Sequence, residues 1–147
     1  MQIRSLTKVD YDFIVSIIDR WWGGLASERA HPVFFYELGR HALVATEGDK
    51  IIGFLMGFVT SEEPKLGYIH LFGIEPEFRR RGVARALYEQ FISAARNEGA
   101  SKIKALAMVG NEDSIRFHGA LDFNVEQVAD YAGSGYPRLV FTKTLNS

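Results

Sequence analysis

Hydrophobic residues recur along this chain with two different spacings, which separate expected helices from expected strands. In the first long segment, apolar side chains fall three or four positions apart, the period of an amphipathic helix. This helix should begin after Thr7, a residue type that caps helices, with Asp10 favouring its first turn. It should end at Gly23-Gly24, because glycine readily adopts the left-handed conformation that closes a helix. The same spacing returns from about Gly82 to Asn97, where the apolar positions are Val83, Leu87, Phe91 and Ala95.

The other apolar segments are short and bounded by turn residues, which predicts strands. An edge strand at residues 3–6 should precede the first helix, and a hairpin should follow at residues 41–60. Further strands are expected at 67–74, 102–108, 123–127 and 138–144, and short helices at 32–38 and 112–120. The order β-α-α-β-β-β-α-β-α-β-β contains no repeat or linker. It predicts one mixed α/β domain over residues 1–147, with two helices that cross over between strands.

Composition narrows the class of protein. With 47% hydrophobic residues, the 147-residue chain can form a sizeable core without covalent links. The formal net charge of −1 argues against a nucleic acid as the main partner. The absence of cysteine excludes disulfides, cysteine-ligated metals and cysteine nucleophiles, and we expect no metal site. No apolar run is long enough for a membrane span and no signal-peptide pattern opens the chain, so we expect a soluble, cytoplasmic protein that does not bind membranes.

The loop before the helix at residues 82–97 combines small residues with positive charge. It reads Arg79-Arg80-Arg81-Gly82-Val83-Ala84. The first N–H groups of a helix lack partners and attract anions, with about 0.3–1 kcal/mol for each charge interaction. Small residues let a ligand approach the backbone closely. The loop matches neither the P-loop nor the dinucleotide-binding glycine pattern. It predicts a cradle for a pyrophosphate, and a solvated run of charge is the alternative.

Two motifs resemble the GNAT superfamily of N-acetyltransferases. The loop at residues 79–84 is similar to the family's [RQ]-x-x-G-x-[GA] signature, which binds acetyl-coenzyme A. The second motif, N-x-x-[AS]-x-x-[LF]-Y-x-x-x-G-F, is matched by Asn111, Ser114, Phe117 and Phe123. The chain departs from it twice, with His118 in place of the usual tyrosine and Asp122 in place of the usual glycine. Aspartate tolerates the positive φ of that glycine better than most residues do.

The resemblance implies the fold and the cofactor. The expected fold is α/β (α+β), a GNAT-like mixed central sheet of about six to seven strands with about four helices. The fourth and fifth strands would be splayed, with Gly73 as a candidate bulge. Acetyl-coenzyme A would lie along the fourth strand and against the arginine loop. The residues that the resemblance assigns to the cofactor are Phe72, Gly73, Ile74, Arg79, Arg80, Arg81, Gly82, Val83, Ala84, Asn111, Ser114 and Phe117.

The family's reaction is a direct attack of a neutral amine on the acetyl thioester. Deprotonating an alkylammonium of pKa about 10.4 at pH 7 costs roughly 4–5 kcal/mol, whereas releasing a thiolate of pKa about 8.5 costs roughly 2 kcal/mol. A base should therefore matter more than an acid. His70 and Tyr68 share one face of the fourth strand, where family members relay the amine proton, and a hydrogen-bonded core role for His70 is the alternative. His118 occupies the general-acid position, although it could equally form a structural hydrogen bond or face solvent.

The acceptor is poorly specified by the sequence. The resemblance places Trp22, Tyr131 and Tyr136 near a primary amine of a small molecule or peptide, and makes a homodimer plausible. A non-catalytic acyl-CoA-binding module of the same fold is the alternative function. A nucleic-acid-binding role for Arg79–Arg81 and Arg85 is the third hypothesis, which the near-neutral charge disfavours.

Overall fold

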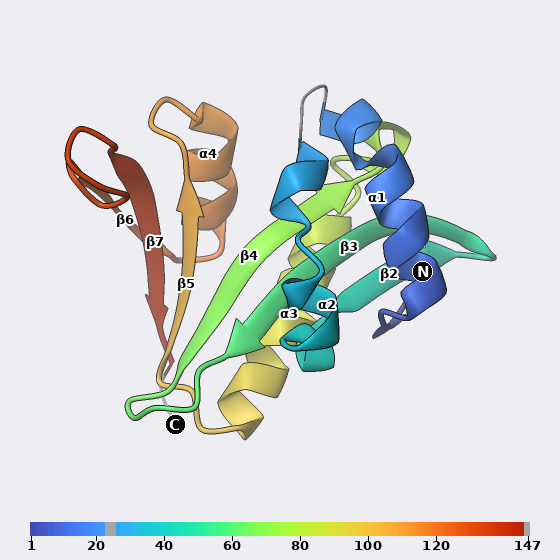
Figure 1. The fold of residues 1–147 in the computed structure, drawn as a ribbon, viewed down its shortest axis with the longest axis horizontal. Coiled ribbons are helices and arrows are strands. Elements are labelled where there is room, and N and C mark those ends of the chain that lie inside the picture. The colour runs from blue at the N-terminus through green and yellow to red at the C-terminus, as the bar shows by residue number, and fades with distance from the viewer. Residues whose placement is uncertain (23–25, 146–147) are drawn as a thin grey trace.

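A single seven-stranded sheet organises the described part of the chain, residues 1–22 and 26–145 of a computed structural model (Figure 1). Its strands are β1 (Gln2–Ser5), β2 (Leu43–Glu47), β3 (Lys50–Val59), β4 (Leu66–Ile74), β5 (Lys102–Ala107), β6 (Asn124–Val128) and β7 (Arg138–Thr144). They lie in the order β1-β2-β3-β4-β5-β7-β6. Neighbouring strands are antiparallel except β4 and β5, which are parallel. The mixed sheet confirms the expected fold class.

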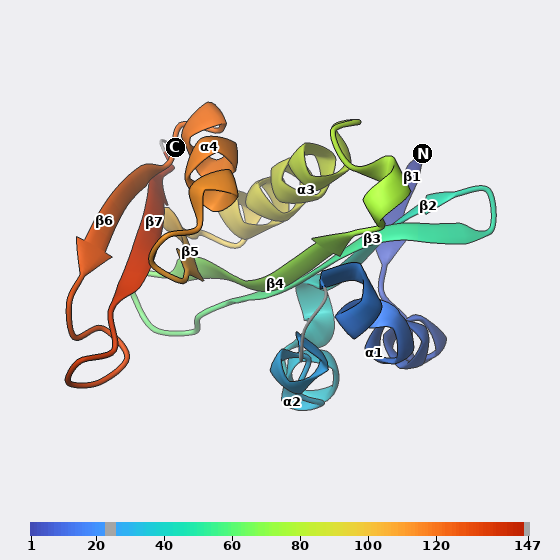
Figure 2. The ribbon, with the colours of Figure 1, turned by 90° about the horizontal axis from the view of Figure 1, so that it is seen from above.

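Helices cover both faces of the sheet. They are α1 (Lys8–Trp22), α2 (Val33–Tyr36), α3 (Val83–Asn97) and α4 (Glu112–Ala120), with short 3₁₀ turns at Ala26–Arg29, Gly39–His41 and Pro76–Phe78. Figure 2 shows α1 and α2 on one face and α3 and α4 on the other. Each face has its own core, one centred on α3 and the other on α1. Among the described residues, no helix has both the length and the apolar character needed to cross a membrane.

The element order and most boundaries agree with the sequence predictions to within a few residues. The start of α1 follows the predicted capping: the Asp10 backbone N–H donates to the Thr7 hydroxyl, and the Thr7 backbone N–H donates to the Asp10 carboxylate. The apolar stripe of α3 is buried, as its spacing predicts. The predicted stop at Gly23-Gly24 lies outside the described residues, and the 3₁₀ turn at Ala26–Arg29 precedes α2.

The sheet opens between β4 and β5, and the opening begins at His70. The parallel pairing covers only Leu66–Ile69 of β4, and it ends where Ile69 faces Ala105. On the other edge of β4, Met56 pairs with Leu71 and Gly57 with Ile69, so His70 is the extra residue of a bulge. The prediction of a bulge at Gly73 is therefore wrong, because Gly73 pairs regularly with Phe54. Beyond the bulge, β5 pairs with β7 and diverges from β4 (Figure 1).

Candidate active site

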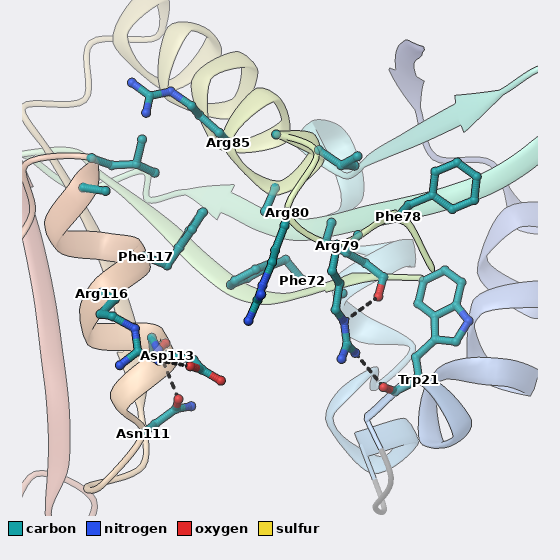
Figure 3. A pocket seen from close by; sticks show the side chains of 18 residues that line it. Trp21, Phe72, Phe78, Arg79, Arg80, Arg85, Asn111, Asp113, Arg116 and Phe117 are labelled. Atoms are coloured by element: carbon teal, nitrogen blue, oxygen red, sulfur yellow. Dashed lines mark hydrogen bonds and ion pairs between the residues drawn. The ribbon is translucent and has the colours of Figure 1, made fainter. Parts of the chain in front are cut away.

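A cavity of about 900 Å³ lies on the α3–α4 side of the opened sheet. Its walls come from the end of β4, the loop into α3 and the inner face of α4 (Figure 3). Twelve residues were assigned to the cofactor from the sequence, and all of them except Arg81 line this cavity. The residues that the sequence did not assign to it include Trp21, Phe78, Arg85 and Arg116. The hydrophobic pattern of α1 predicts that Trp21 belongs to the core around that helix. It does not indicate that Trp21 also lines this cavity.

The start of α3 presents unpaired amides to the cavity. Gly82 caps the helix with φ of 79° and provides no side-chain cap, so the first N–H groups of α3 keep no intrahelical partner. Arg80 also adopts a positive φ, 63°, an uncommon conformation for a residue with a side chain. In Figure 3 its side chain extends into the cavity toward α4. A helix start with exposed amides and an adjacent guanidinium is suited to hold a phosphate group.

The other two arginines of the loop are engaged within the protein. Arg79 donates from Nη2 to the Trp21 carbonyl at 2.7 Å and from Nε to the Ile74 carbonyl at 3.3 Å (Figure 3). Its guanidinium therefore ties the loop to the end of α1, although the side chain still borders the cavity. Arg81 lies over the Phe78 ring, 5.1 Å from its centroid, and does not line the cavity. The structure thus gives three consecutive arginines three different environments, rather than the single shared ligand that we expected.

The opposite wall belongs to α4. The Asn111 side-chain carbonyl accepts a hydrogen bond from the Ser114 backbone N–H at 3.1 Å and caps the helix, which leaves its amide NH₂ available to a ligand. Phe117 stacks on Phe72 of β4, with ring centroids 5.5 Å apart. The two rings form an apolar floor between the helix and the strand. Asp122, which follows α4, has φ of 65°, as expected for the residue in place of a glycine.

His118 does not reach the cavity. Its side chain is 1% exposed, stacked 4.0 Å from the Phe141 ring, and hydrogen-bonded at both nitrogens. Since the Ser114 carbonyl can only accept, Nδ1 donates to it, and Nε2 must accept from the Tyr88 hydroxyl at 2.8 Å. Burial lowers the pKa of His118 to about 4. The prediction of His118 as a general acid requires correction, because a buried neutral imidazole whose two nitrogens are both occupied has no proton to offer at the cavity.

His70 lies on the opposite side of the sheet from α3, where α2 covers it. Its ring stacks on Phe34, with centroids 3.7 Å apart, and its Nε2 bonds the Arg29 carbonyl at 2.7 Å. A carbonyl accepts only, so Nε2 carries the hydrogen and Nδ1 of the neutral ring keeps a free lone pair. Burial lowers the pKa of His70, and the bond to Arg29 partly opposes this. The half-buried ring is thus held as a neutral base at the bulge where the sheet opens.

Aromatic side chains surround His70 on this face. The Tyr68 ring lies 6.4 Å from that of His70. Tyr131 of the β6–β7 loop lies near this face, because its ring is 4.7 Å from Nζ of Lys104, the β5 partner of Tyr68. Burial raises the pKa of Tyr68, and the neighbouring Tyr131 adds to this rise. Tyr136 is 63% exposed at the far end of that loop. Trp22 is the last residue of α1, and its predicted substrate contact lies outside the description.

Comparisons with known proteins agree with this geometry. A model of the acetyltransferase (GNAT) family matches residues 11–123. A search of curated protein sequences finds no significant match. Among solved structures, Ard1 from Thermoplasma volcanium is 20% identical, with a TM-score of 0.81 over 99% of this chain and 98% of that one.

Two further structures are similar. The ribosomal-protein-S18-alanine N-acetyltransferase of Escherichia coli is 18% identical, with a TM-score of 0.78 over 99% of this chain and 94% of its own. An aminoglycoside 6'-N-acetyltransferase complexed with coenzyme A is 15% identical, with a TM-score of 0.76 over 100% and 98%. At these identities the structures establish the shared fold, and the family model adds a match over most of the chain. The chain belongs to the GNAT acetyltransferase family.

Proposed function

We propose that this protein transfers an acetyl group from acetyl-coenzyme A to a primary amine of a small molecule or peptide, and that residues 1–147 act as one catalytic domain. The observation that carries the proposal is a cavity that runs from a phosphate-suited helix start to residues 72–74, the end of β4 that β5 no longer pairs with. A pyrophosphate carrier with a thioester at the far end of a long arm fits such a cavity. Acetyl-coenzyme A would supply the activated acetyl group, and the similar aminoglycoside 6'-N-acetyltransferase is complexed with coenzyme A.

The chain's own residues would divide the binding between them. Arg80 and the amides that follow Gly82 would hold the pyrophosphate. Residues 71–74 pair with β3 along one edge of β4, and no strand of the described chain pairs with the other edge beyond Ile69. Their free backbone groups can therefore hydrogen-bond an extended ligand arm as an added strand would. Asn111 would donate from its free NH₂ across the cavity.

His70 is the group that we assign as the base. Its free Nδ1 can take a proton from the acceptor ammonium, directly or through one water, and this is the more expensive of the two proton transfers. The amine nitrogen would then bond the acetyl carbon while the carbon–sulfur bond breaks and sulfur leaves as the thiolate. The second proton that the nitrogen loses on becoming an amide would pass to this thiolate or to water. Because release of a thiolate costs only roughly 2 kcal/mol at pH 7, the reaction can proceed without the general acid that we had expected His118 to provide.

The alternative, a module that binds acyl-CoA without catalysis, has no observation that favours it over the enzyme. The neutral histidine at the sheet opening favours catalysis, because a carrier module has no use for a base there. Formation of a homodimer and a cytoplasmic location stay predictions.

Release of free thiol from acetyl-coenzyme A, measured with a panel of amines, tests the proposal. We expect amine-dependent release together with acetylated product in mass spectrometry. His70→Gln should lose at least about a hundredfold in kcat, the lower end of the usual range for a general base, and keep acetyl-coenzyme A binding. Binding of acetyl-coenzyme A with no thiol release from any amine would support the non-catalytic module instead. No binding at all would overturn both readings.

A further inference from the structure

One positive side chain faces the acceptor side of the sheet beside the opening. Lys104 lies on β5 between Ile103 and Ala105, which both belong to the core around α3. Since side chains alternate along a strand, Lys104 points to the opposite face, the one that carries His70. Its direct partner on β4 is Tyr68, two residues before His70. With strands about 4.8 Å apart and a rise of about 3.3 Å per residue, the backbones of Lys104 and His70 lie at least about 8 Å apart, since β4 and β5 diverge from His70 onward.

The half-buried Lys104 has no negative partner within the described chain. Its Nζ lies over the Tyr131 ring, 4.7 Å from the centroid, and none of the ion pairs or hydrogen bonds of residues 1–22 and 26–145 includes it. Its two cross-strand partners, Tyr68 and Thr142, carry hydroxyl groups. The residues in register with Lys104 across β7 and β6 are Thr142 and Asn124, which are uncharged, and Glu126 of β6 is in register with Leu106 instead.

The chain offers a useful comparison in Lys102. It lies on the same strand and, two residues earlier, on the same face, but it is exposed and pairs with Leu66 and Thr144 at the closed end of the sheet. Lys104, in contrast, stands next to the last parallel pair, Ile69 and Ala105, where the sheet opens. Of these two lysines, only Lys104 can reach a ligand that has its amine at His70.

We propose that Lys104 selects acceptors that carry a carboxylate close to the reacting amine. The inference rests on the proposed function and deepens it, because it names the chemical class of the acceptor. The acceptor's amine would lie at Nδ1 of His70 and its carboxylate at Nζ of Lys104, while the Tyr131 ring holds the lysine side chain in place. A separation of at least about 8 Å between the backbones, spanned in part by the two side chains, suits an acidic amino acid or an acidic residue beside a peptide N-terminus.

Acetyl transfer to matched dipeptide amides tests this selection. The amides Ala-Asp and Ala-Asn have the same shape and the same α-amine, and they differ in one negative charge. We expect kcat/KM for Ala-Asp amide to exceed that for Ala-Asn amide by about tenfold at low salt, and Ala-Lys amide to be the poorest of the three. In Lys104→Gln the preference should fall to within twofold, and in Lys104→Glu it should reverse in favour of Ala-Lys amide.

Controls separate this inference from the function on which it rests. Lys102→Gln should keep the preference of the wild-type chain. Calorimetric binding of acetyl-coenzyme A should be equal in the three lysine variants, which shows that they fold and hold the cofactor. Equal use of Ala-Asp and Ala-Asn amides by the wild-type chain, or a preference that persists in Lys104→Gln, would overturn the inference and leave the acetyltransferase activity standing. Absence of transfer to every amine would overturn the proposed function itself.

Discussion

The buried pair of Tyr88 and His118 should make the stability of this protein depend on pH. The fold holds His118 neutral, with a pKa of about 4, whereas in the unfolded chain its pKa is about 6.5. Above pH 6.5 neither state binds the proton, and the contribution of the pair is fully present. As the pH falls from 6.5 toward 4, the unfolded chain takes up the proton and the folded chain does not. Stability is therefore lost over this window.

The size of the loss follows from the two pKa values. A difference of about 2.5 units corresponds to about 3 kcal/mol by pH 4, a large share of the 5–15 kcal/mol by which domains are usually stable. The double variant Tyr88→Phe/His118→Phe removes the titrating group and both hydrogen-bonding partners together. At pH 7 this exchange should cost little, because Tyr88 and His118 lose their mutual hydrogen bond together. The Ser114 carbonyl loses the Nδ1 donor of His118, but it lies inside α4, where a carbonyl accepts from the backbone N–H four residues on. The phenyl ring at position 118 can keep the stacking on Phe141.

Urea unfolding followed by tryptophan fluorescence, repeated at half-unit steps from pH 7 to pH 4, measures the effect. We expect the free energy of unfolding to fall by about 3 kcal/mol more in the wild-type chain than in the double variant. His31→Gln, a change at an exposed histidine, serves as the control and should follow the wild-type curve. Parallel curves for the wild-type chain and the double variant would refute the buried, neutral assignment of His118.

Three further substitutions test individual contacts. Arg79→Gln should cost about 1–3 kcal/mol of stability, because the carbonyls of Trp21 and Ile74 lose their donor, while Arg80→Gln should instead weaken acetyl-coenzyme A binding. Urea unfolding and calorimetric binding measure the two effects in both variants, and equal losses of affinity would contradict this division. Asn111→Asp should keep the cap of α4 and its stability but lower affinity for acetyl-coenzyme A, because it loses the free NH₂; unchanged affinity would remove this donor from the site. For the wild-type enzyme, kcat/KM should stay high at pH values below the ordinary pKa of histidine, because burial lowers the pKa of His70. If kcat/KM instead begins to fall above pH 6.5, and His70→Gln shows the same pH dependence, the base is another group.

Periodicity and turn residues were sufficient to predict the elements, because each element's apolar pattern is local. The stripe of α3 and the capping of α1 by Thr7 and Asp10 are examples. The bulge was misplaced because it depends on how β3 pairs with β4. An extra residue such as His70 looks like any other strand position until its partner strand is known, whereas Gly73 attracts attention by its type alone.

The site shows the same division between local and distant information. The positions of Gly82 and Asn111 follow from their motifs. The different environments of Arg79, Arg80 and Arg81 depend on the positive φ of Arg80 and on the end of α1, which lies 58 residues before Arg79 along the chain. The role of His118 depends likewise on Tyr88, 30 residues away. For Lys104 a signal was present, since a lysine between two core-facing residues marks the opposite face, but its neighbour Tyr131 comes from a separate loop.

The central claim is that acetyl-coenzyme A binds where α3 begins, and two glycines allow a matched test of it. Gly82 and Gly48 both have positive φ, and a Cβ added at either would meet no atom within 4 Å. Valine at either position should therefore cost about 1–2 kcal/mol of backbone strain. Only Gly82 lines the cavity, whereas Gly48 lies in the turn between β2 and β3.

Calorimetric titration of acetyl-coenzyme A into the wild-type chain, Gly82→Val and Gly48→Val makes the comparison directly. We predict one binding site per chain in the wild-type protein and in Gly48→Val, and no measurable binding in Gly82→Val. Equal binding in all three proteins, or no binding in the wild-type chain, would contradict the account.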